Sequence, residues 1–72
     1  MNTYLIPIFD GEDIYIHNIT AKDLDSAEDK LMDELCDEYE ELDPNILYFN
    51  EFINDAMSKG IWIGDFYDKE TF

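Results

Sequence analysis

The chain has little positive charge, few residues that form covalent cross-links, and no motif of a resident cofactor. Four Lys and no Arg stand against 19 Asp and Glu, which gives a formal net charge of −15 at pH 7. This balance argues against binding to naked nucleic acid or to an anionic membrane surface, and it favours a basic partner. Cys36 is the only cysteine, so it cannot form an internal disulfide and nothing indicates an oxidising compartment.

A leader and a membrane segment are also missing from the sequence pattern. The first residues, MNTYLIPIFDGED, contain no basic leader and only a short apolar run before the acids begin. Signal peptides and membrane-spanning helices need longer apolar segments. We therefore expect a soluble protein of the cytoplasm that has no membrane partner.

Motifs for catalysis and for metal binding are absent too. The sequence has no Gly-rich phosphate loop, no paired zinc ligands and no EF-hand spacing of Asp, Gly and Glu. His17 is the only histidine and alternates with apolar residues, so a structural or surface imidazole is expected there. Cys36 is expected to be a small packing residue. We therefore expect no enzyme activity, no catalytic residues, no metal site and no cofactor. A calcium-responsive domain remains open as an interpretation, beside the two functions that the acidic segment suggests below.

The apolar content, in contrast, is that of a folded protein. Hydrophobic residues make up 46% of the 72 residues and aromatic residues 15%. A disordered acidic tail would contain far less apolar material. The length allows a single domain over residues 1–72, close to the size at which one core only marginally offsets chain entropy.

The first quarter of the chain has the pattern of a β-hairpin. TYLIPIF and IYIHNIT are short, apolar and rich in β-branched and aromatic residues, and DGED lies between them. This predicts a hairpin over residues 3–20 with its turn at DGED. Alternation places Tyr4, Ile6 and Ile8 on one face of the first strand. Pro7 has no N–H to donate, which favours an edge strand or a bulge at that position.

A helix is predicted next, over residues 23–42. Asp23 is a candidate N-cap, and Thr20 competes with it through the pattern Thr20-x-x-Asp23. The helical period is carried by a stripe of apolar residues: Leu24, Ala27, Leu31, Met32, Leu35, Tyr39 and Leu42.

The remainder predicts a second helix and a third strand. Asp43 and Pro44 are typical of a helix start, and Lys59 with Gly60 of a helix end, so the second helix is expected over residues 44–59. Its expected buried stripe is Ile46, Phe49, Ile53 and either Ala56 or Met57. IWIGDFY predicts a strand over residues 61–67. The expected fold is α+β in the order ββααβ, with two helices on a small three-stranded, mostly antiparallel sheet.

The most unusual segment is DLDSAEDKLMDELCDEYEELD, residues 23–43, in which eleven positions carry a carboxylate and one carries a lysine. Like charges four residues apart each cost a helix about 0.2–0.5 kcal/mol, so stability alone does not explain the pattern. Residues four apart rise by about 6 Å along a helix, close to the spacing of phosphates in a nucleic-acid strand. The expected partner-binding residues are Asp25, Glu28, Asp29, Asp33, Asp37, Glu40 and Glu41.

In size and charge, and through the acidic run 23–43, the chain resembles the small acidic inhibitors encoded by bacteriophages and mobile elements. These include anti-CRISPR, anti-restriction and glycosylase-inhibitor proteins, several of which are DNA mimics. The resemblance rests on no shared motif. It implies a basic nucleic-acid-binding partner, a host nuclease or its guide complex in the bacterial cell, blocked at the groove that would receive DNA.

A different class of function remains open beside the inhibitor. The chain could be a small interaction or antitoxin-like module that binds a basic protein surface without competing with nucleic acid. Aromatic residues near the end and in the second helix would give either protein an apolar anchor beside the acidic face if they are exposed. The same residues could instead support a homodimer. They are Tyr48, Phe49, Phe52, Trp62, Phe66 and Tyr67.

Overall fold

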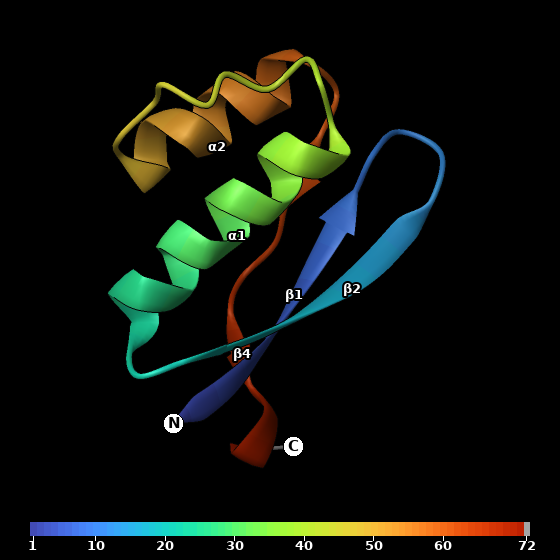
Figure 1. Cartoon of the computed structure of the whole chain (residues 1–72). Coiled ribbons are helices and arrows are strands. Elements are labelled where there is room, and N and C mark those ends of the chain that lie inside the picture. Colours follow the sequence, from blue (N-terminus) through green and yellow to red (C-terminus); the bar gives the residue numbers. More distant parts are fainter. Residues whose placement is uncertain (72) are drawn as a thin grey trace.

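The computed structural model describes residues 1–71 and has an antiparallel sheet with both helices on one side of it (Figure 1). The elements are β1 (Asn2–Phe9), β2 (Ile14–Ala21), α1 (Leu24–Glu38), α2 (Phe49–Ser58), β3 (Trp62–Ile63), β4 (Tyr67–Asp68) and a short 3-10 helix (Lys69–Thr71). The predicted α+β class is confirmed. Phe72, the last residue of the expected domain, lies outside the described residues.

The hairpin of β1 and β2 is confirmed, and its turn is the predicted one. The two strands pair antiparallel over their full length. The carboxylate of Asp10 accepts the backbone N–H of Glu12 at 3.0 Å and that of Asp13 at 2.9 Å. Hydrogen bonds from these two N–H groups lower the pKa of Asp10. Gly11 has a φ of +96°, a conformation that glycine adopts without steric cost.

Pro7 was expected on an edge strand or at a bulge, and the structure corrects the first alternative. β1 is the central strand, with β2 on one side and β3 and β4 on the other. The N–H of Gly64, the residue after β3, donates to the carbonyl of Pro7 at 2.8 Å, so this carbonyl points toward the side of β1 on which β3 lies. Pro7 has no N–H to return, and the ladder with β3 ends there.

The third strand, expected as one piece over residues 61–67, is therefore split into β3 and β4. Ile63 lies opposite Ile8, and Tyr67 lies opposite Leu5. From Ile63 to Tyr67 the chain advances four residues, whereas their partners on β1 are only three residues apart. The segment from β3 to β4 therefore contains a bulge of one extra residue. The shift brings Trp62 and Tyr67 to the same face of the sheet although they are five positions apart.

The core lies between the sheet and the two helices. Ile6 and Ile8, which alternation places on one face of β1 together with Tyr4, are fully buried, and Tyr4 packs beside them. The other buried residues are Ile19, Ala21, Ala27, Leu31, Leu35, Leu42, Phe52, Ala56 and Ile61. Phe66 packs against this core, with its ring edge-on to Tyr4 at 6.2 Å and to Phe49 at 5.5 Å.

Helix α1 begins where the sequence predicts but ends four residues early, at Glu38 rather than at residue 42. The carboxylate of Asp23 caps it by accepting the N–H of Ser26 at 2.9 Å, whereas Thr20 belongs to β2. No basic residue lies in the last turn of α1. Continuing the helix would therefore add carboxylates to its negative end. The chain instead becomes extended at Tyr39, and this turn lets Leu42 reach the core.

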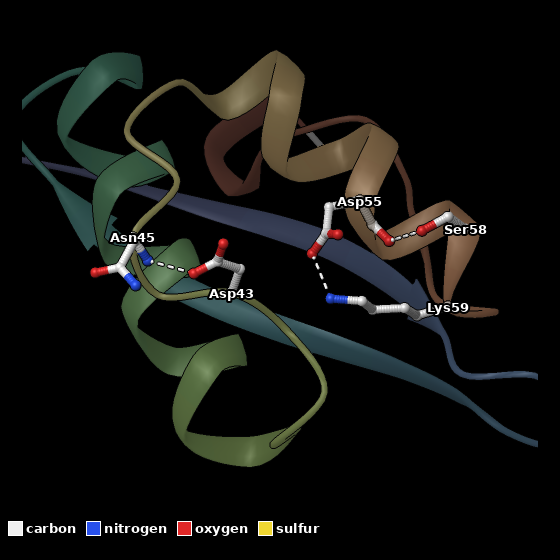
Figure 2. A network of polar contacts seen from close by, with 5 residues as sticks. All are labelled: Asp43, Asn45, Asp55, Ser58 and Lys59. Carbon is white, nitrogen blue, oxygen red and sulfur yellow. Dashed lines mark hydrogen bonds and ion pairs between the residues drawn. The ribbon is translucent and has the colours of Figure 1, made fainter.

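Helix α2 begins at Phe49, not at residue 44. Asp43 forms only a local turn, in which its carboxylate accepts the N–H of Asn45 at 2.9 Å (Figure 2). The chain then runs irregularly to Tyr48, and Ile46 packs on the core from this loop. The expected buried stripe is confirmed in part, since Ala56 is fully buried and Phe49 packs on the core. Phe52, which the prediction left out, is the other buried residue of α2, whereas Met57 is exposed.

The end of α2 is the predicted one. The N–H of Gly60 donates to the carbonyl of Met57 at 3.1 Å, and the N–H of Ile61 donates to that of Ala56 at 2.9 Å. These bonds and the φ of +83° at Gly60 form a Schellman motif. Lys59 forms an ion pair with Asp55 at 2.9 Å (Figure 2).

The face of the sheet away from the helices is bare in the described residues, and it is largely apolar, with Thr3, Asn18 and Thr20 as its polar residues. Five large side chains on it are exposed: Phe9, Ile14, Ile16, Trp62 and Tyr67. The strand pairing places no carboxylate of the strands on this face, since Asp68 lies opposite Tyr4 and therefore on the helix side.

Candidate interaction surface

The outer side of α1 carries a row of exposed carboxylates. The row consists of Asp25, Asp29, Asp33 and Asp37, each four residues from the next. The opposite side of α1 fixes the helix to the sheet through Ala27, Leu31 and Leu35, all of which are fully buried. We call the four aspartates the carboxylate row. A helix anchored in this way presents the row at intervals of about 6 Å.

No ion pair neutralises the carboxylate row within residues 1–71. The lysine of the same helix, Lys30, donates to the backbone carbonyl of Thr20 at 2.6 Å. Lys59 is paired with Asp55, and the imidazole of His17 lies 3.4 Å from Glu38. Ordinary solvated helices interleave both signs of charge, which this surface does not.

Glu28 was expected in the partner-binding set but points away from the carboxylate row. It is half-buried and lines a groove together with Phe49 and Phe66. Burial raises the pKa of Glu28, and the charges of Asp25 and Asp29 raise it further. At neutral pH this carboxylate is therefore ionised in an environment that disfavours its charge.

We predict that Glu28→Gln raises the melting temperature at pH 7. Because the pKa of Glu28 is raised in the folded state, folding favours its protonated form. The stability that this preference contributes is present below the ordinary pKa of 4.5 and is lost as the pH rises through the raised pKa. Gln keeps the neutral form at every pH, so its advantage should disappear below about pH 4. Thermal unfolding of the variant and of Glu41→Gln across this range measures the effect. An equal shift in both variants would mean that net charge alone acts.

Glu40 and Glu41 were also expected in the set, on the helix, but α1 ends before them. Both are exposed and lie in the turn that leads from α1 to the buried Leu42. They add negative charge near the end of the carboxylate row without continuing its spacing. Of the seven predicted residues, the structure therefore brings four into one row.

The structure adds a groove that the sequence pattern did not indicate. The groove has a volume of about 620 Å³ and lies between α1 and the loop that precedes α2. Asp29, Asp33 and Asp37 border it, and Asp43 from the loop joins them. Its apolar lining includes Met32, Ile46 and Leu47. The contribution of Asp43 depends on how the loop folds back on α1, and no local sequence signal specifies that path.

Cys36 lies in the same groove and packs against the core. Burial raises the pKa of its thiol, and the charges of Asp33 and Asp37 raise it further. The thiol is therefore kept in its weakly nucleophilic, protonated form. Within residues 1–71 no three His, Cys, Asp or Glu side chains gather as a set that could hold a metal ion.

The aromatic residues do not form an anchor beside the acidic face as a group. Phe52 is buried, and Phe49 and Phe66 pack on the core. Trp62 and Tyr67 are exposed, but they lie on the bare face of the sheet, on the other side from α1. Tyr48 is exposed in the loop before α2.

No protein-family model, curated protein or solved structure matches the chain. None of the helices in residues 1–71 is both long enough and apolar enough to cross a membrane.

Proposed function

We propose that the protein is a non-enzymatic acidic inhibitor that occupies the nucleic-acid-binding site of a host defence nuclease by DNA mimicry. The anti-CRISPR and anti-restriction inhibitors of phages are the class we expect, acting in the cytoplasm of a bacterial cell. The observation that carries this proposal is the carboxylate row, four exposed aspartates at helical spacing with no cation paired to them in residues 1–71.

Two properties of the row and one property of its expected target support mimicry of a nucleic-acid backbone. Its spacing of about 6 Å is close to that of successive phosphates in a strand. Its helix is held by three fully buried residues, so the charges are preorganised and little entropy is lost on binding. A site that evolved to bind phosphates presents Lys and Arg, which form charge-assisted hydrogen bonds with carboxylates equally well.

The groove beside the row suits the side chains of such a site. A long cationic side chain could place its methylene groups on Met32 and Leu47 and its charge beside Asp33 and Asp43, which all line the groove. Leu47 is 79% exposed in the free protein, so binding would also remove apolar surface from water. This combination of a charged rim and an apolar floor favours Arg and Lys over small cations.

The test is capture from a bacterial lysate that contains defence nucleases, with the tagged protein at moderate salt and elution by duplex DNA. A nuclease or guide complex released by DNA would support the proposal and identify the target. The control elutes with monovalent salt at the ionic strength of the DNA solution, which must release less. A partner that stays bound in the presence of saturating DNA would contradict mimicry.

A second function, an interaction module for a basic protein surface, is favoured by the bare face of the sheet. Contiguous exposed apolar surface of this kind often marks a protein interface. Such a module would use Trp62 and Tyr67 as well as charge, and DNA would not displace its partner. The competition experiment therefore separates the two functions.

A further inference from the structure

The outer edge of β2 is unpaired in the described residues. β2 is the terminal strand in the sheet order β2-β1-β3 and pairs only with β1. The carbonyl of Pro7 accepts the N–H of Gly64, so the backbone polar groups of Pro7 face the side of β1 on which β3 lies. The backbone N–H and C=O of Ile16, which lies opposite Pro7 in β2, therefore face the outer edge. Backbone direction alternates along a strand. The outward N–H and C=O groups are therefore those of Ile14, Ile16, Asn18 and Thr20.

One outward group already has a partner, and it confirms this assignment. The carbonyl of Thr20 accepts the hydrogen bond from Lys30 at 2.6 Å. Natural edge strands are usually protected by proline, by a bulge, by an inward charge or by a covering segment. β2, with the sequence IYIHNITA, has no proline and no charged Lys, Asp or Glu, and it pairs with β1 without interruption.

A groove of about 330 Å³ runs along this edge. Asn18, Ile19 and Thr20 line it from β2, and Lys30, Asp33 and Glu34 line it from α1. Glu38 lies further along α1, beside His17. The helix side of the edge is therefore acidic, since the three carboxylates of Asp33, Glu34 and Glu38 outnumber the one ammonium group of Lys30.

The opposite side of the same edge is apolar at the end formed by Ile14 and Ile16, and polar at the other end, where Asn18 and Thr20 lie on the same face. Ile14 is 69% exposed and Ile16 is 55% exposed, and both belong to the bare face. A strand added to β2 would alternate its side chains between the two sides of the sheet. Those on the helix side would meet the carboxylates of α1, and those on the other side would continue the bare face beside Ile14 and Ile16.

We propose that the outer edge of β2 is a docking site for an extended basic segment of a partner polypeptide, which adds to the sheet as a further strand. Lys or Arg at alternate positions would face Asp33, Glu34 and Glu38, and apolar residues would lie between them. Backbone hydrogen bonds would give affinity, and the alternation would give selectivity. A second copy fits poorly, because pairing two β2 edges would bring two molecules of net charge −15 together at their acidic helices. This proposal does not require the partner to bind nucleic acid.

The probe is a synthetic peptide of alternating Lys and Val, titrated into the full chain at low salt. Amide hydrogen exchange should show an alternating signature. The N–H groups of Ile16, Asn18 and Thr20 should exchange quickly in the free protein and become protected when the peptide binds. The N–H groups of His17 and Ile19, which face β1, should be protected in both states.

Two changes remove the backbone contacts without changing any charge. Asn18→Pro deletes an outward N–H and should weaken binding by up to about tenfold, as expected for one lost hydrogen bond, whereas the matched Asn18→Ala should bind as the unaltered chain does. If the proline variant fails to fold, the same peptide with alternate N-methylated residues makes the test on the native chain, where it should not bind.

Three results would overturn the proposal. The N-methylated peptide could bind as tightly as the unmethylated one, which would leave charge attraction alone. The alternating peptide could fail to bind or to protect the outward amides. The outward amides could already be protected in the free protein at a level that rises with protein concentration, which would make a second copy the occupant of the edge.

Discussion

Reversal of Asp29, Asp33 and Asp37 to Lys should abolish binding to the target and leave the fold intact. The three side chains are exposed and have no ion-pair partner in residues 1–71, so no folded-state contact is lost. A phosphate contact on duplex DNA contributes about 0.9 to the slope of log affinity against log salt, and a carboxylate on a protein, which has no condensed counterion layer, contributes less. Removing three such contacts and adding repulsion should lower affinity by at least about 100-fold at moderate salt.

The matched control for this variant reverses three exposed acids elsewhere. Glu12, Asp65 and Glu70 lie outside the carboxylate row, and changing all three to Lys alters the net charge by the same amount, from −15 to −9. Binding of both variants is measured at two salt concentrations, and circular dichroism checks the fold. If the row variant is folded and still binds within a few-fold of the unaltered chain, the row is not the binding surface. Equal losses in both variants would mean that total charge is what the target recognises.

Features that depend on a few neighbouring residues could be predicted from the sequence. The turn at Asp10 and Gly11, the cap at Asp23 and the helix end at Gly60 all follow from hydrogen bonds within five residues. Alternation similarly predicted that Ile6 and Ile8 share a face of β1, and both are fully buried. In each case the local chemistry and the final packing agree, as expected for a chain with consistent signals at both levels.

Features that depend on distant contacts could not be predicted. The segment between the helices was expected to be helical, but Leu42 and Ile46 reach the core from an irregular path. Phe52, absent from the predicted stripe, became the largest fully buried side chain once α2 began at Phe49. The predicted signals for helix ends were present, yet the competing demand for core packing decided the boundaries.

The candidate site shows the same division. The spacing of Asp25, Asp29, Asp33 and Asp37 follows from helical geometry, so the row could be predicted wherever a helix was correctly expected. Glu28 left the set because its side of α1 lies toward α2, which only the tertiary structure reveals. Asp43 and the open edge of β2 are likewise consequences of how the elements meet.

Gly64→Ala should be strongly destabilising, because it acts where Pro7 interrupts the third strand. A Cβ at residue 64 would lie 2.5 Å from Cγ of Pro7 and 3.1 Å from its carbonyl oxygen. The first distance is below any real contact, and a proline ring in a central strand has little freedom to move. Overpacking of this kind costs about 1–3 kcal/mol. That is a large share of the roughly 4–10 kcal/mol expected for a domain of this size.

A double-mutant cycle with Pro7→Ala tests the cause of this loss by urea unfolding. Alanine at position 7 removes Cγ and Cδ, the atoms nearest to the new Cβ apart from the carbonyl oxygen. Gly64→Ala should therefore cost less in the Pro7→Ala background than in the native one, with a coupling of about 0.5–3 kcal/mol. Additive costs would instead place the effect in the backbone of residue 64 itself. The same cycle tests the bulge, because the Pro7→Ala variant regains the N–H that Pro7 lacks and could extend the β3 ladder to Gly64.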